Sequence, residues 1–363
     1  MVAPIMGPVV GGLITDSLGW QWIFFVNVPV CIVMMVMAKI FLVESPRKVR
    51  HADWTGMGLL TLAVCLMQFV LDKGNDDGWF ESKWILFSAI ASAFFWVVFI
   101  VRGYGNPNNI VKFEVFKDRN FMLACLSMMF CSAIVFGSFT WVPLWLEMVM
   151  NYLPKDAGML MFPRGLVGMV TMMILPFVMR FLGPKIALGA FAVVFSFTFM
   201  IFSHFNAQQG ESTFFWPNLL MGVAGGFFFV PLAAAAYATL NPVLRDEASG
   251  LYNFSRSLGT SIGVAVFSTI MTSESQRVWN HLSSFIRGDN PAFQTWLSAN
   301  HQTLNSPMAY PLIAKTIYQQ SMMQAFVDGC YGFGIAVLFL IPLLFFFKIP
   351  KIAAKKSGVA LDH

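Results

Sequence analysis

Apolar stretches long enough to cross a lipid bilayer recur along the whole chain and restrict the folds open to it. A bilayer core about 30 Å thick is crossed by about 20 apolar residues, because a helix rises about 1.5 Å per residue. Such stretches fall near residues 1–15, 23–43, 57–72, 84–102, 121–147, 157–179, 186–204, 214–240, 254–273 and 329–347. We therefore predict an all-α integral membrane protein with about ten transmembrane helices, of which the first and third are short.

Composition supports a lipid environment for most of the chain. Hydrophobic residues make up 57% of the sequence and charged residues 11%, whereas ordinary globular domains contain about 25% charged residues. The mean hydropathy is +0.68. The alternating pattern of an outer-membrane barrel does not recur, so we expect each span to satisfy its backbone hydrogen bonds as a helix.

Lysine and arginine are unevenly divided between the loops, which predicts the orientation. If the first helix runs outward, fifteen of the 23 basic residues lie in inner loops and the tail, and six lie in outer loops. Positive residues are retained in the cytoplasm, so we expect both termini there. The long polar segment 274–327 then lies outside, and 349–363 forms a cytoplasmic tail. The net charge of +5 therefore reflects topology and not a nucleic-acid-binding surface.

Within the outer segment, residues 311–327 read PLIAKTIYQQSMMQAFV. This amphipathic pattern suits a helix lying along the outer membrane surface. A plain connector fits the segment as well.

Patterns that indicate cofactor or catalytic chemistry are weak. The five cysteines lie in apolar spans without paired metal spacing, the histidines are scattered, and no phosphate-binding loop of the G-x-x-x-x-G-K-[ST] type occurs. Residues 259–263, GTSIG, match G-x-S-x-G with Ser261 in the nucleophile position. That motif requires a strand-to-helix turn, and here it lies inside an apolar helix. We expect no catalytic residue, no metal and no cofactor.

Glycines spaced four residues apart predict close helix packing. Each such pair clears one helix face, so that a neighbouring backbone can approach. The pairs are Gly7 and Gly11, Gly222 and Gly226, and Gly259 and Gly263. Beside the first pair, Pro8 and Gly12 add a kink and a further small residue.

Charged residues within the spans are the best candidates for a functional site. A charge at mid-membrane costs about 2.5–3.5 kcal/mol on insertion scales. Arg164 is either a structural arginine bonded to carbonyls or part of a transport route. Arg256 either snorkels or contacts the 245–247 loop as a gate, or it lines the transport pathway, and Asn253 of the same segment is a further pathway or gating candidate. Glu147 is either a proton or cation site or an exposed helix-end glutamate.

Several motifs resemble the EmrB/QacA-type drug:proton antiporters, the fourteen-helix branch of the major facilitator superfamily. GPVVGGLITDSLGWQWIFFVNVP, residues 7–29, is similar to the antiporter signature on their fifth helix. LDKGNDDGWFES, FKDRNFMLAC, MFPRGLVGMV, GVAGGFFFVPL and EASGLYNFSRSLGTSIG resemble later family motifs in the same order. The family's antiporter signature contacts the other half of the bundle, which implies that role for Gly7, Pro8, Gly11 and Gly12.

The resemblance also implies a division of the chain. Residues 1–43 correspond to the last two helices of the first half, 44–120 to two extra central helices with their loops, and 121–348 to the second six-helix half. Helices one to four of the family would then be absent.

The function implied is efflux of small hydrophobic or cationic drug-like compounds across the bacterial inner membrane, driven by the proton gradient. The implied partners are the bilayer, a periplasmic membrane-fusion protein and an outer-membrane channel. Two other readings are a non-transporting fragment or interaction subunit of such a permease, and a membrane hydrolase that uses Ser261.

Overall fold

The computed structural model describes residues 7, 10, 11, 14, 15, 17–41, 53–104, 109, 111–206, 210–300, 303 and 309–347. Its elements are helices, given in chain order. They are α2 (Trp22–Phe25), α3 (Asn27–Phe41), α4 (Trp54–Lys73), η1 (Trp79–Glu81), α5 (Lys83–Gly103), η2 (Phe113–Lys117), α6 (Arg119–Met148), α7 (Pro154–Phe202), α8 (Glu211–Tyr237), η3 (Pro242–Leu244), α9 (Arg245–Ser283), α10 (Pro291–Ala299), α11 (Ala309–Leu338) and α12 (Leu340–Phe345).

The all-helical prediction is confirmed for the described residues. Seven of their helical segments are long and apolar enough to cross a membrane. The 49-residue α7 contains two of the expected spans, joined at Gly183, where a φ of +73° breaks the helical path. The 39-residue α9 adds a span whose polar ends lower its hydropathy. These helices account for nine of the ten expected spans, and the first span lies largely outside the described residues.

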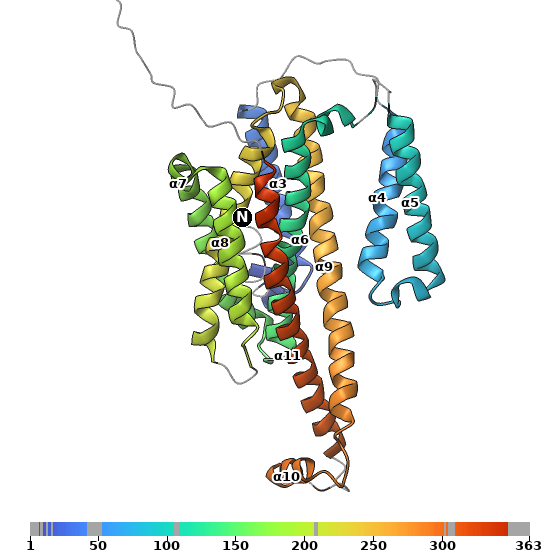
Figure 1. Cartoon of the computed structure of the whole chain (residues 1–363), viewed down its shortest axis with the longest axis vertical. Coiled ribbons are helices and arrows are strands. Elements are labelled where there is room, and N and C mark those ends of the chain that lie inside the picture. Colours follow the sequence, from blue (N-terminus) through green and yellow to red (C-terminus); the bar gives the residue numbers. More distant parts are fainter. Residues whose placement is uncertain are drawn as a thin grey trace, which may run out of the picture.

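Two pairs of closely packed helices form the centre of the bundle, α6 with α9 and α7 with α8 (Figure 1). Glycines set the distance within each pair. A Cβ atom at Gly259 would overlap the carbonyl of Met129, and one at Gly263 would overlap the carbonyl of Ala133. At these contacts, therefore, only glycine allows the two backbones to lie so close.

The segment between the last two spans is largely helical, which differs from the expected outer loop. The 39 residues of α9 span about 58 Å, roughly twice the bilayer core. Figure 1 shows α9 and α11 running past the rest of the bundle, with α10 lying across their end. Phe293 and Leu297 of α10 pack on Ala309 and Ile313 of α11, which buries the apolar face of this extension.

The amphipathic segment 311–327 is part of the continuous helix α11, so the structure contradicts its placement along the membrane surface. Its inner part packs in the bundle, where Met323, Ala325 and Phe326 are buried. Tertiary packing of these residues explains why the helix continues in line with the last span. Periodicity alone could not distinguish that arrangement from a surface helix.

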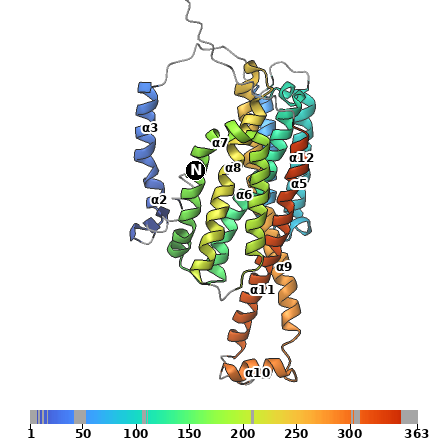
Figure 2. The same cartoon turned by 60° about the vertical axis from the view of Figure 1, so that its left-hand side comes forward.

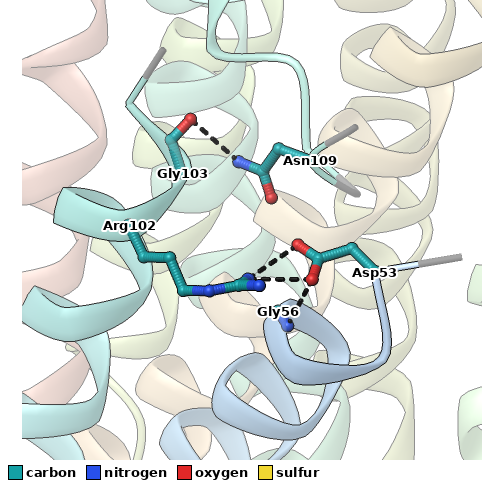
Figure 3. A network of polar contacts seen from close by, with 5 residues as sticks. All are labelled: Asp53, Gly56, Arg102, Gly103 and Asn109. Carbon is teal, nitrogen blue, oxygen red and sulfur yellow. Dashed lines mark hydrogen bonds and ion pairs between the residues drawn. The ribbon is translucent and has the colours of Figure 1, made fainter. Parts of the chain in front are cut away.

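A hairpin of α4 and α5 lies beside α9 (Figure 1) and is tied together at one end by a polar network. Asp53 caps α4 by accepting a hydrogen bond from the Gly56 backbone N–H at 3.0 Å. Arg102 of α5 donates from Nη1 to Asp53 Oδ1 at 2.8 Å and to Oδ2 at 2.9 Å, as Figure 3 shows. Beside it, Asn109 donates to the Gly103 carbonyl at 3.3 Å.

Helix α3 stands apart from the bundle (Figure 2). It is apolar along its length, yet none of its residues is buried. An apolar helix of this kind contacts lipid or a further protein segment.

Candidate functional site

Arg164 of α7 is buried inside the bundle, directly after Pro163. Its side chain is 1% exposed. The guanidinium donates from Nη2 to Ser138 Oγ of α6 at 2.9 Å, and its Cζ lies 3.8 Å from the ring centroid of Phe139. A desolvated cation–π contact of this kind contributes about 2 kcal/mol.

These contacts leave much of the guanidinium without partners. Nε and Nη1 of Arg164 make no hydrogen bond to any described residue. The ion pairs in the described part of the chain lie elsewhere and do not involve Arg164. Burying a charge without an ion-pair partner costs free energy. Side-chain packing alone therefore does not account for an arginine at this position.

A second buried polar group lies on the neighbouring helix. Asn218 of α8 is 0% exposed and donates from Nδ2 to the Leu160 carbonyl at 2.6 Å, while its Oδ1 has no partner among the described residues. One turn further along α8, a Cβ atom at Gly222 would overlap the backbone of Arg164. Sequence reasoning missed both Ser138 and Asn218. A single small polar residue in an apolar span was the available signal, but such residues are common in membrane helices.

An aromatic group fills the space between α6, α9 and α11. Phe326 stacks on Trp141 with ring centroids 4.8 Å apart and on Trp145 at 4.3 Å. Phe267 stacks on Phe333 at 3.7 Å. Beside this group a cleft of about 270 Å³ opens between α6 and α9.

The other charged candidates lie apart from Arg164. Arg256 is half-buried in α9, and its Nε has no hydrogen-bond partner among the described residues. Asn253 is exposed and donates to the Ser249 carbonyl of its own helix at 3.0 Å. Glu147 is half-buried near the end of α6.

Residues 245–247 form the first turn of α9 and not a loop, which corrects the segment proposed as a gate contact for Arg256. Within that turn, Glu247 pairs with Lys112 at 2.8 Å. The acidic first turn suits the positive end of the helix dipole.

The glycine signature near the amino terminus is described only in part. A Cβ atom at Gly7 or Gly11 would meet no atom within 4 Å in the part of the chain that the structure describes. Pro8 and Gly12 lie outside the described residues. Of the late glycines, Gly226 faces Thr171 and the Gly168 carbonyl of α7, in line with Gly222 on the same face.

Ser261 has none of the surroundings of a nucleophile. Its hydroxyl donates to the Ser257 carbonyl at 3.3 Å within α9. The described residues contain no strand that could form a nucleophile elbow.

Long apolar helices packed through glycines, with an arginine buried among them, define a multi-pass helical membrane protein. The sequence model described as Major Facilitator Superfamily matches residues 1–264, and the chain belongs to this superfamily of transporters, which are not enzymes. The chain is 30% identical to the multidrug export protein EmrB of Escherichia coli K12, over 99% of this chain and 71% of that protein.

Two further relatives match with similar sequence identity and coverage. The EmrB protein of Haemophilus influenzae is 28% identical, over 91% of this chain and 64% of its own length. The fatty acid resistance protein FarB of Neisseria gonorrhoeae is 28% identical, over 96% of this chain and 70% of its own length. The chain is thus a transporter-family protein related to drug and fatty acid resistance proteins.

Proposed function

We propose that the chain forms most of a proton-driven efflux permease of the bacterial inner membrane that exports small hydrophobic or cationic drug-like compounds. The observation that carries this proposal is the alignment of 99% of the chain with a multidrug export protein. Among the described residues, Arg164 is a charged group buried in the bundle without an ion-pair partner, and we assign it a role in contacting the substrate.

The proton gradient supplies enough free energy to drive such export. Moving one elementary charge across 100 mV is worth about 2.3 kcal/mol. Alternating access in this class requires two halves that move about a central site. In this proposal α6 to α9 with α11 and α12 supply one half, and both termini lie in the cytoplasm.

A complementation assay tests the proposal. The chain is expressed in cells that lack their own pumps, together with a fragment carrying the first four helices of the E. coli EmrB protein. We expect export of a fluorescent cationic dye that a protonophore abolishes. Export insensitive to the protonophore would reject proton coupling. No export by an inserted pair would favour the alternative function, a non-transporting fragment or interaction subunit.

Partners are tested separately, because dye export from whole cells does not reveal them. The proposed partners are a periplasmic membrane-fusion protein and an outer-membrane channel. The α9–α10–α11 extension is the described part that reaches furthest beyond the bundle (Figure 1), so it is the region to truncate in a co-purification experiment.

A further inference from the structure

Asn75, in the turn between α4 and α5, makes two hydrogen bonds to α9. Its Nδ2 donates to Ser268 Oγ and to Thr272 Oγ1, both at 3.0 Å. These two acceptors are four residues apart, so they lie one above the other on the same helix face. Both also line the cleft between α6 and α9. The turn therefore contacts the part of α9 that forms one wall of that cleft.

The turn that presents Asn75 is held in shape by its own contacts. The Trp79 backbone N–H donates to the Gly74 carbonyl at 2.6 Å. Gly78 and Trp79 have φ angles of +72° and +54°, and a bulky residue stays in this left-handed region only where surrounding contacts hold it. A Cβ atom at Gly74 would overlap the ring of Trp79, which packs over the turn. Asn75 therefore reaches α9 from a preformed turn.

The hairpin behind this turn is joined at its middle and at its other end. Ser92 Oγ of α5 donates to the Ala63 carbonyl of α4 at 2.8 Å, and both residues are buried. At the end far from the turn, Arg102 holds Asp53 through two hydrogen bonds. Because α4 and α5 are joined at these positions, we infer that the hairpin moves as one body.

A second polar contact ties the opposite end of the hairpin region to α9. Lys112, in the segment after α5, pairs with Glu247 in the first turn of α9 at 2.8 Å. Glu247 and Ser268 are separated by about 30 Å along α9. An ion pair with a hydrogen bond is about twice as strong as a neutral hydrogen bond, and the bonds of Asn75 are neutral. The Asn75 contact is therefore the end that separates more easily.

Release of Asn75 leaves its former partners with other hydrogen bonds to make. Elsewhere on α9, Thr269 Oγ1 donates to the Ala265 carbonyl, four residues back, at 2.8 Å. The hydroxyls of Ser268 and Thr272 can make the same kind of bond. In the orientation proposed above, Asn75 lies in an outer turn, where its amide can bond water. The contact can therefore open and form again without stranding a polar group.

We propose that Asn75, Ser268 and Thr272 form a releasable contact, here called the outer latch, that holds α9 against the hairpin and opens when α9 tilts. The hairpin region contacts α9 at both ends, so a tilt of α9 relative to it must break one contact, and the outer latch is the weaker. The latch therefore favours the present width of the cleft between α6 and α9. That α9 tilts during export rests on the proposed function, whereas the latch itself does not.

Spin labels test the latch in the purified 363-residue chain, held in lipid nanodiscs. Phe80→Cys in η1 and Ser273→Cys on α9 are exposed labelling positions, in a background without the five native cysteines. Asn75→Leu keeps a similar volume but has no donor. We expect it to raise the ratio of a longer to a shorter label distance about tenfold, the effect of losing two neutral hydrogen bonds. Asp77→Ala, at an exposed position of the same turn, is the matched control and should leave the ratio unchanged.

Removing the acceptors tests whether the contact itself is responsible. Ser268→Ala combined with Thr272→Val should raise the same ratio by the same factor as Asn75→Leu. Adding Asn75→Leu to that pair should have no further effect, because the two sides of one interaction are not additive. An unchanged ratio in Asn75→Leu, or additive effects in the combined variant, would overturn the latch.

A reversible cross-link tests whether export requires release. In Asn75→Cys with Thr272→Cys, a short bifunctional methanethiosulfonate joins the two thiols through disulfides, which dithiothreitol reduces. The protein is expressed with the four-helix fragment of EmrB. We expect the cross-linked protein to lose dye export and to regain it on reduction, while Asn75→Cys alone, treated with the same reagent, keeps exporting. Export by the fully cross-linked protein would overturn release of the latch as a step in transport. Absence of export from the untreated parent would reject the proposed function, and the spin-label ratios would still decide the latch.

Discussion

Arg164 and Ser138 form a buried polar link between α7 and α6, in which Arg164 Nη2 donates to Ser138 Oγ at 2.9 Å. The same guanidinium lies over the ring of Phe139, the next residue of α6. The Arg164 guanidinium therefore contacts two consecutive residues of α6, Ser138 through a hydrogen bond and Phe139 through a cation–π contact. This arrangement fixes the register of α7 against α6 while leaving Nε and Nη1 without partners among the described residues.

Replacing this arginine should impair export more than folding. In the complementation assay, we expect Arg164→Ala to lower dye export at least about tenfold, because the charge-assisted contact and the cation–π contact are both lost. Immunoblotting of membranes checks insertion. Ser261→Ala is the control, since Ser261 bonds only within its own helix, and it should export near normally. Loss of export in the control with normal export in Arg164→Ala would reverse both assignments.

Two glycines on α8 give a matched pair for helix packing. A Cβ atom at Gly222 would overlap the Arg164 backbone, whereas one at Gly225 would meet nothing within 4 Å. We expect Gly222→Ala to destabilise the protein by about 1–3 kcal/mol, the usual cost of overpacking. Gly225→Ala should be neutral or stabilising by up to about 1 kcal/mol, from helix propensity. Thermal unfolding in detergent measures both, and equal melting temperatures would contradict the packing.

Sequence reasoning predicted the helices well because bilayer thickness sets their length. It could not predict that α9 and α11 extend beyond the bundle, since packing of Phe293 on Ala309 and Ile313 depends on tertiary structure. It identified Arg164 because a charge in an apolar span is conspicuous. It missed Ser138 and Asn218, whose importance depends on which residue faces them across the helix interface.

The contact between Asp53 of the α4 cap and Arg102 of α5, here called the α4–α5 clamp, should weaken in acid. The Gly56 backbone N–H and then the Arg102 guanidinium hold the pKa of Asp53 below its ordinary value of 3.8. The clamp therefore contributes full stability above about pH 5 and loses it as the pH falls below 3.8 through the lowered pKa. Spin labels at Trp54→Cys and Tyr104→Cys, both exposed positions, measure the separation of the hairpin ends.

We expect the distance distribution of that label pair to be narrow at neutral pH and to broaden in acid. In Asp53→Asn it should be broad at every pH, because the paired carboxylate is absent. An Asp53→Asn distribution that is as narrow as the parent at neutral pH would show that the clamp does not hold the hairpin.

The unequal division of basic residues predicts the orientation. In a background without the five native cysteines, Ser298→Cys should react with an impermeant maleimide in intact cells, and Ser357→Cys should not. Ser298 is exposed on α10, so its reactivity reports only the side of the membrane. Ser357 lies outside the described residues, and its side is predicted from charge alone. Labelling of Ser357→Cys would reverse the orientation.

The exposed apolar surface of α3 leads to a prediction about export by a polypeptide of residues 1–363 expressed alone. The apolar residues of α3 are exposed on every side, and a Cβ atom at Gly7 or Gly11 would meet no atom of the described residues within 4 Å. Small-residue faces in membrane helices are normally covered by a neighbouring helix, so these two segments lack, among the described residues, the protein contacts that the proposed alternating access would require. We expect no protonophore-sensitive dye export from this polypeptide alone, and partial export when the four-helix fragment is co-expressed. Val33→Cys on α3 should become less reactive toward a membrane-permeant maleimide when the fragment is present. Export by the 363-residue polypeptide alone would show that α3 works without a protein partner.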